Sequence, residues 1–330
     1  MHPKGVKAEV KPIAGLFWSG QTAKGQPNSI GARVLMRIAT ASYPLDVLES
    51  WAQFEDKTAN WVAEAAGQGA DLLVFPEYGA MEVATLDGLD VAGDLEKSLF
   101  SVSDRLPEID ALHVRLAAEH GVHIVAASAP AATQTRPVNR ARLITPNGQI
   151  GVQDKQIMTR FESEVWDVIG GGPLQVFDTA LGRIGILICY DSEFPLLGHA
   201  LQSCDIIAVP SVTEALAGYW RVRTGAMARA LENQCVTVMS SIVGDAKWSD
   251  ALGSCVGAGG IFCPPDVGFP STGVMAAAEL CMPGWTYADV DLGAIANVRS
   301  DGVVLNRSHW DLQVGRDAPA LNVALNRFCS

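Results

Sequence analysis

Apolar residues form short uninterrupted runs that alternate with longer stretches of helical spacing along most of the chain. The run over residues 33–41, RVLMRIATA, predicts a buried strand, and the spacing over residues 44–68 predicts a helix. A second buried strand, DLLVFPE, ends at Glu77. A helical stretch over residues 106–120 then precedes a strand over residues 122–129. This alternation of strands and helices predicts an α/β layered fold.

The middle of the chain adds a β-hairpin. In ARLITPNGQIGVQDKQ, two strand-like runs flank Pro146, Asn147 and Gly148, which together are a strong turn signal. Hairpins make the predicted sheets mixed rather than purely parallel. Further predicted elements are a helix over 218–234 and strands over 174–177, 184–189, 206–210, 236–241 and 257–262.

The first thirty residues carry Pro, Gly, Gln and Ser without a clear period, which predicts an irregular extension over residues 1–30. No repeat or linker interrupts the remainder, so we expect a single domain over residues 31–330 with a C-terminal tail.

Composition narrows the class of protein. With 48% hydrophobic and 18% charged residues, a folded globular protein is expected. The net charge of -12 opposes binding to nucleic acid or an anionic membrane, and no basic patch is visible. All seven cysteines lie in the second half without a CxxC pair, which argues against a disulfide scaffold or a zinc site and predicts a cytoplasmic protein. No segment reaches membrane-spanning length.

Cys189 is the first candidate for chemistry. It follows an apolar run and precedes the polar residues Tyr190, Asp191 and Ser192, so an abrupt change from strand to turn is expected there. Such a turn exposes a nucleophile and directs backbone N–H groups at a developing oxyanion. Taken alone, an inert buried cysteine is the commoner interpretation. A reactive thiol also needs a base or a nearby cation, and the six histidines lie in no recognisable cysteine-protease context.

Two other predicted strand ends carry suitable groups. Glu77 follows a wholly apolar strand, where a carboxylate is costly to bury unless it is paired. Lys155 ends the second strand of the hairpin. Considered singly, Glu77 could be a turn or capping carboxylate and Lys155 a surface charge. Considered with Cys189, they form a candidate catalytic set.

The three motifs FPEYG, DKQ and GILICYDSEFP, in this order, resemble those of the nitrilase (carbon-nitrogen hydrolase) superfamily. The likeness extends over about residues 33–291 and includes ARALEN at 228–233 and AVPS at 208–211. The resemblance implies an αββα sandwich of two mixed sheets between helices. It also implies a homodimer or larger homo-oligomer, and chemistry that requires no metal or organic cofactor.

The resemblance also implies roles for the matched residues. Cys189 would attack the carbonyl carbon and form a thioester, with Glu77 as general base and then acid. Lys155 and the backbone N–H of Tyr190 would stabilise the oxyanion. Many members carry a second acidic residue after the lysine, for which Glu162 is the best match.

That last assignment has an alternative in Glu164, because the spacing varies within the family. The segment KQIMTRFESE also departs from the family pattern, since Ile157 stands where a histidine is common. This departure puts Glu162 in doubt and leaves the three principal residues unaffected.

The substrate is expected to be a small amide, with an N-carbamoyl compound or a nitrile as alternatives. CYDSEFP is closer to the cysteine-tyrosine-aspartate form of amidases and carbamoylases than to the cysteine-tryptophan-glutamate form of nitrilases. Tyr78, Phe161, Glu193 and Trp220 are the candidate substrate contacts. If Glu193 faces the pocket, it would repel an anionic substrate tail, whereas a helix cap is the alternative. A catalytically silent binding protein of the same fold is the alternative of a different class.

Overall fold

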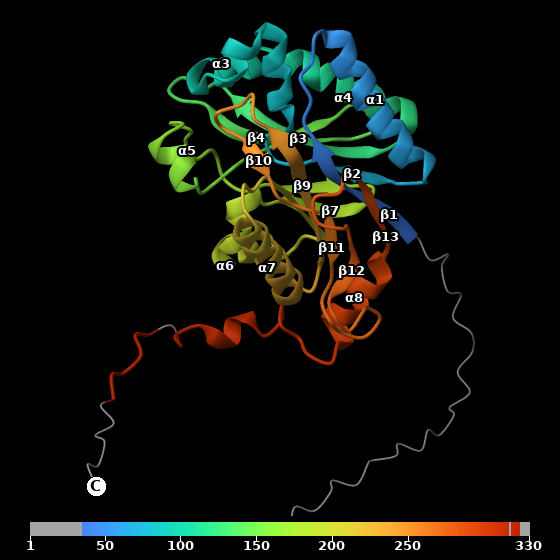
Figure 1. The fold of residues 1–330 in the computed structure, drawn as a ribbon. Helices are drawn as coiled ribbons and strands as arrows, with labels where there is room; N and C mark the ends of the chain where they lie inside the picture. The colour runs from blue at the N-terminus through green and yellow to red at the C-terminus, as the bar shows by residue number, and fades with distance from the viewer. Residues whose placement is uncertain (1–34, 317, 324–330) are drawn as a thin grey trace, which may run out of the picture. The chain divides into compact units, whose positions relative to one another are not determined.

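The computed structural model describes residues 35–316 and 318–323. The extension expected over residues 1–30 lies outside these residues, so it stays a prediction, as does the single domain over 31–330. Within the described residues, thirteen strands form one hydrogen-bonded network with helices on both of its outer sides (Figure 1).

The first layer consists of the strands in the order β5, β4, β3, β2 and β1. Their bounds are Leu35–Pro44 for β1, Leu72–Val74 for β2, His123–Ala131 for β3, Val138–Ile144 for β4 and Ile150–Asp154 for β5. A further strand, β13 (Gly284–Asp291), runs antiparallel to β1. The outer helices of this layer, seen together in Figure 1, are α1 (Trp51–Gly67), α3 (Leu95–Asp104) and α4 (Leu106–His120).

The network continues from β1 through β9, β8, β7 and β6 into the second layer. β1 pairs with β2 over residues 38–40 and with β9 only over residues 42–44, so the hydrogen bonding passes between layers at one end of β1. The strands are β6 (Val176–Thr179), β7 (Gly182–Ile186), β8 (Ile206–Ser211), β9 (Val236–Ala246), β10 (Gly253–Cys255), β11 (Gly260–Phe262) and β12 (Val274–Ala277). The helices are α6 (Pro195–Ala200), α7 (Leu216–Asn233) and α8 (Leu292–Asp301).

Five shorter helical elements complete the described fold. They are η1 (Gly79–Asp87), α2 (Leu89–Ala92), α5 (Arg160–Glu164), η2 (Cys189–Glu193) and η3 (Trp310–Gln313). Among them, η1, α5 and η2 each begin within a few residues of a predicted catalytic side chain.

The core explains why the two layers stay together. Side chains alternate along β1, so Ala39 and Ala41 pack under α1 and α4, whereas Ile38 faces the strands of the second layer. That second cluster takes in residues of β7, β8 and β9, including the whole run 206–209 of β8 and therefore both faces of the sheet, together with Val222 and Ala226 of α7. Apolar side chains thus fill the space under the helices of the first layer, the space between the two sheets and the space under α7, which is the packing of an αββα sandwich, so the predicted fold class is confirmed.

Several predicted elements need correction. The first helix begins at Trp51 rather than at residue 44, because Pro44 ends β1 and the Ser50 hydroxyl caps the helix by accepting from the Gln53 N–H. The strand predicted over 184–189 ends at Ile186, and Cys189 lies in a 3₁₀ turn. By contrast, α4 has the predicted bounds and the hairpin of β4 and β5 is confirmed.

Within residues 35–316 and 318–323, every helix is too short or too polar to cross a membrane.

Candidate active site

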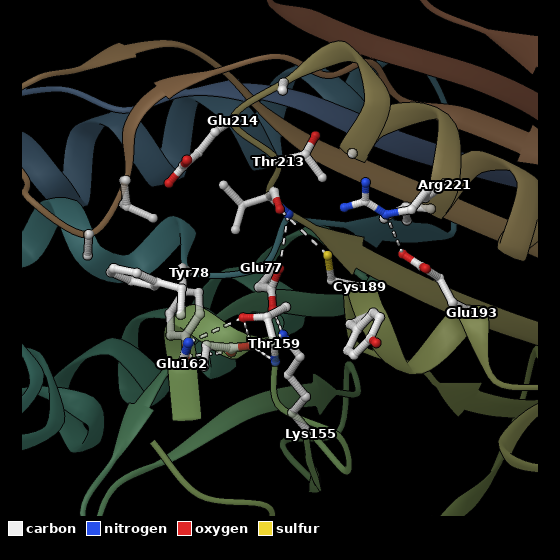
Figure 2. Close-up of a pocket in the computed structure, with 18 of the residues that line it drawn as sticks. Glu77, Tyr78, Lys155, Thr159, Glu162, Cys189, Glu193, Thr213, Glu214 and Arg221 are labelled. Atoms are coloured by element: carbon white, nitrogen blue, oxygen red, sulfur yellow. Dashed lines mark hydrogen bonds and ion pairs between the residues drawn. The ribbon is translucent and has the colours of Figure 1, made fainter. Parts of the chain in front are cut away.

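The three predicted catalytic side chains meet at the ends of strands from both layers. Glu77 lies shortly after β2, Lys155 directly after β5, and Cys189 at the start of η2. Glu77 and Lys155 are 1% exposed and Cys189 is 5% exposed. All three line a pocket of about 320 Å³, in which Figure 2 shows them side by side. Side chains distant in sequence thus share one cavity.

The Lys155 ammonium lies between two carboxylates. Its Nζ is 2.7 Å from Glu77 Oε1 and 2.6 Å from Glu162 Oε2. Burial lowers the pKa of Lys155, but the two carboxylates more than offset burial and raise the pKa above its usual value. Lysine has three N–H donors, and these two bonds use two of them. The charged ammonium therefore keeps one donor for a further acceptor.

Glu162, rather than Glu164, is the second acidic residue of this cluster. Its Oε2 also accepts from the Thr159 N–H and the Thr159 hydroxyl, each at 2.9 Å, as part of the cap that begins α5. Burial raises the pKa of Glu162, but the contact with Lys155 outweighs it and the net shift is downward. Glu164 is exposed and paired with Arg160. The helix cap therefore holds an ionised carboxylate against the lysine.

The two oxygens of Glu77 differ in their partners. Oε1 accepts from Lys155 Nζ and from Asn139 Nδ2, the latter at 2.9 Å, whereas Oε2 accepts from the Val212 N–H at 3.0 Å. Burial and the neighbouring Glu162 raise the pKa of Glu77 to about 7, although Lys155 acts in the opposite direction. At neutral pH this carboxyl is poised between its two forms, and Oε2 has room for a proton.

Cys189 occupies a constrained turn beside Glu77. Its φ of 49° lies in the left-handed region, which a residue with a side chain adopts at a cost in energy. The thiol Sγ is 3.6 Å from the carbonyl oxygen of Val212, whose N–H donates to Glu77. One residue of the chain thus contacts both reactive groups.

The protonation state of Cys189 differs from the simplest expectation. Burial, followed by the negative charge of Glu77, raises the pKa of the thiol well above its usual value. Lys155 acts to lower the pKa but does not outweigh these effects. At neutral pH the sulfur is therefore a thiol.

Asp191 is a residue whose part in the site the sequence analysis missed. Its buried carboxylate accepts backbone N–H bonds from Gln156 at 3.1 and 3.2 Å, from Ile157 at 2.9 Å and from Ile188 at 3.3 Å. It therefore ties the turn that carries Cys189 to the segment that follows Lys155. Burial raises the pKa of Asp191 to about 6, although these N–H donors act in the opposite direction.

Asn139 is a second missed residue. It lies inside β4 and is fully buried, with its Nδ2 donating to Glu77 and its Oδ1 accepting from the Ser128 hydroxyl at 2.6 Å. β4 also carries Arg140 and Arg142, so polarity alone did not single out Asn139, and strand pairing was needed to locate its partner.

Three of the four predicted substrate contacts line the pocket, and the fourth does not. Tyr78, Phe161 and Glu193 line the pocket, as does Tyr190, which was predicted as a backbone oxyanion donor. Trp220 does not line it, and with 51% exposure it lies over a neighbouring surface depression. The reason is helical geometry, because the preceding Tyr219 points inward and a step of one residue turns the next side chain away. The other pocket walls are largely apolar and include Trp166, Val212, Ala251 and Leu252.

Within the part of the chain that the structure describes, no group of three or more His, Cys, Asp or Glu side chains is arranged to hold a metal ion. The six described cysteines are all free thiols.

Comparison with known proteins places the chain in a family. Residues 37–260 match the family described as Carbon-nitrogen hydrolase. The probable hydrolase YhcX of Bacillus subtilis is 30% identical over 273 residues, which are 82% of this chain and 52% of that protein. The chain thus spans about half the length of this relative.

Solved structures share the fold. A carbon-nitrogen hydrolase from Helicobacter pylori aligns with a TM-score of 0.67 at 18% identity, covering 81% of this chain and 92% of that one. A double mutant of the amidase from Nesterenkonia sp. AN1, in complex with acrylamide, aligns with a TM-score of 0.61 at 17% identity, covering 83% and 97%. On the family match, which covers more than half of its residues, this chain belongs to the carbon-nitrogen hydrolase family.

Proposed function

We propose that this protein hydrolyses the carbon-nitrogen bond of a small amide, with Cys189 as nucleophile, Glu77 as proton carrier and Lys155 as oxyanion donor. One observation carries the proposal. The pocket that holds the Cys189 thiol also holds an oxygen of Glu77 with capacity for a proton and a lysine ammonium with one donor left. A nucleophile, a base and a cation around one cavity are what acyl transfer requires.

In the first half of the reaction, Sγ of Cys189 bonds to the amide carbonyl carbon while its proton passes to Glu77. The carbonyl oxygen becomes an oxyanion, which Lys155 Nζ and the backbone N–H of Tyr190 stabilise. Glu77 then returns the proton to the leaving nitrogen as the carbon-nitrogen bond breaks. Ammonia or an amine leaves, and the acyl group remains on Cys189 as a thioester.

The second half releases the acid. Glu77, again a carboxylate, takes a proton from a water molecule while the oxygen of that water attacks the thioester carbon. The carbon-sulfur bond breaks and the proton returns to Sγ, which restores the thiol. A pKa of about 7 suits a group that must both take and give a proton near neutral pH. Throughout, the ionised Glu162 keeps Lys155 charged and in place.

An amide is favoured over a nitrile by the CYDSEFP segment after the nucleophile. The Nesterenkonia amidase, whose fold this chain shares, is described with acrylamide bound, which is a small amide. The pocket volume of about 320 Å³ also suits a small acyl group. The homo-oligomeric state and the cytoplasmic location remain predictions.

The test compares a matched amide and nitrile with the same acyl skeleton by measuring acid formation. We expect faster hydrolysis of the amide, and a covalent adduct of the acyl mass on the wild-type protein in intact mass spectra after acid quench. Cys189→Ala should abolish both turnover and the adduct. Cys281→Ala, which alters an exposed cysteine outside the pocket, should abolish neither. Turnover that persists in Cys189→Ala would sink the proposed mechanism.

A further inference from the structure

The pocket has a second polar feature apart from the catalytic cluster. Arg221 of α7 and Glu193 of η2 both line the pocket, and Arg221 Nε is 3.5 Å from Glu193 Oε1. Figure 2 shows Glu193 on the Nε side of the guanidinium, while the two terminal nitrogens point toward the side of the cavity where Thr213 and Cys189 lie. The guanidinium therefore lies at the pocket wall with its Nε toward Glu193, on a side chain that is 63% exposed.

The donors of Arg221 are largely uncommitted. A guanidinium has five N–H groups, four of them on the terminal nitrogens, and the ion pair with Glu193 engages the Nε side. Gly218 keeps the adjoining space open, because a Cβ there would lie 3.7 Å from Arg221 Nη2 and 3.0 Å from the Cβ of Thr213. A ligand group can therefore approach these terminal nitrogens.

This arrangement changes the expected effect of Glu193. From the sequence, Glu193 was expected either to face the pocket and repel an anionic substrate tail or to cap the next helix. In the structure the side chain is 21% exposed and faces Arg221, so its charge is partnered by a cation. Glu214 also lines the pocket but lies away from Arg221 in Figure 2, and both side chains are exposed, so solvent screens both charges. The cation available to a substrate tail is Arg221.

We propose that Arg221 is a specificity-determining residue that binds a carboxylate at the far end of the acyl chain, so that the preferred substrates are monoamides of short dicarboxylic acids. The inference rests on the proposed function, since it names the substrate class of that site. Two terminal guanidinium nitrogens match the two oxygens of a carboxylate and bind them in bidentate fashion.

The test uses two substrates that share one acyl chain, the monoamide of a four- or five-carbon dicarboxylic acid and its methyl ester, on the wild-type protein and on Arg221→Gln. We expect the wild type to prefer the free acid. Arg221→Gln should lower kcat/KM for the acid about 10- to 100-fold, the range expected for lost hydrogen bonds to a charged group. The loss should fall mainly on KM, because the contact is remote from the reacting atoms.

A matched control is Arg183→Gln, which removes another exposed arginine paired with a single carboxylate, on β7 outside the pocket. It should leave the acid-to-ester ratio unchanged. A wild-type preference for the ester, or an equal loss on both substrates in Arg221→Gln, would overturn the proposal while leaving amide hydrolysis intact.

Binding separates this inference from the proposed function. In the Cys189→Ala background, the affinity of the dicarboxylate product can be measured by calorimetric titration without any turnover. Weaker binding after the added Arg221→Gln change supports the role of Arg221, whether or not the amides are hydrolysed. A failure to hydrolyse either amide would count against the proposed function and not against this inference. Equal binding with and without Arg221 rejects the carboxylate site.

Discussion

Two buried lysine-glutamate pairs in this molecule have similar chemistry and different surroundings. Lys155 and Glu77 meet at 2.7 Å beside the Cys189 thiol. Lys57 of α1 and Glu82 of η1 also meet at 2.7 Å, in the first layer. In both pairs burial acts to raise the pKa of the glutamate and the lysine acts to lower it. The pairing alone therefore does not distinguish a reactive site from a structural one.

The two lysines differ in the number of ammonium N–H donors that remain without a partner. Lys57 Nζ contacts the Pro44 carbonyl, Glu82 and Asp46, each at 2.7 Å, so its three donors are used. Lys155 has two carboxylate partners and lines a pocket. A saturated lysine holds elements together, whereas an unsaturated one facing a cavity can stabilise a charge that develops there.

The sharpest way to break this comparison is to neutralise each glutamate. Glu77→Gln removes the proposed general base and should lower kcat by about 100- to 10,000-fold. Glu82→Gln, the matched control, should leave kcat of the folded protein unchanged. Its cost should appear in the free energy of unfolding, by about 1.5–3 kcal/mol for a hydrogen-bonded charged group. Steady-state kinetics and urea denaturation of both variants measure these two effects. Similar kcat values in Glu77→Gln and Glu82→Gln would show that the two pairs do not differ in their part in catalysis.

Exchanging each lysine for methionine gives the next largest effect. Lys155→Met should lower kcat about 100- to 1,000-fold, as expected for the loss of one oxyanion donor. Lys57→Met should instead lower the free energy of unfolding by about 3–5 kcal/mol, because it leaves Glu82 buried without its cation. A fall of less than about tenfold in Lys155→Met would place this lysine outside the reaction.

Asp191 tests whether position, as well as charge, makes the site reactive. Asp191→Asn turns an amide NH₂ toward backbone N–H donors, so the Cys189 turn should shift relative to the segment after Lys155. We expect kcat to fall roughly 10- to 100-fold, the scale of a small misplacement of reacting groups.

The control for Asp191 is Asp266→Asn, because Asp266 likewise accepts N–H bonds from Val267, Val303 and Val304 but lies outside the pocket. It should alter thermal stability and not kcat. Equal kinetic effects in the two variants would show that Asp191 acts only through general stability.

The last prediction is a pH dependence that needs no mutation and is small near neutral pH. Glu77 must be ionised to accept the thiol proton, and its pKa is about 7, so kcat/KM should fall as pH drops below 7. The slope should approach tenfold per pH unit for a single proton. Below pH 6, where Asp191 also takes up a proton, the fall should steepen. Rates from pH 5 to 9, with circular dichroism to follow folding, measure it, and a flat profile through pH 7 would argue against Glu77 as the base.

The sequence by itself determined the features that are local in the chain. The bounds of α4 follow from one helical apolar pattern, and the β4–β5 hairpin follows from one turn signal. Glu77, Lys155 and Cys189 could be identified because each follows its own apolar run within a short motif. Their common site was expected from the resemblance of these motifs to the nitrilase superfamily, and the family match supports that resemblance.

Tertiary structure decided which side chains surround Glu77, Lys155 and Cys189 and what protonation state each of them has. Asn139 and Arg221 reach the site from segments outside the three sequence motifs, and the contact of Asp191 with the segment after Lys155 joins two of those motifs across the fold. Trp220, beside an inward-facing residue on the same helix, turns away from the pocket. The pKa values of Glu77 and Cys189 depend on burial and on charges brought from distant strands. Distances between remote residues, and the solvent they exclude, exist only once the two layers have packed together.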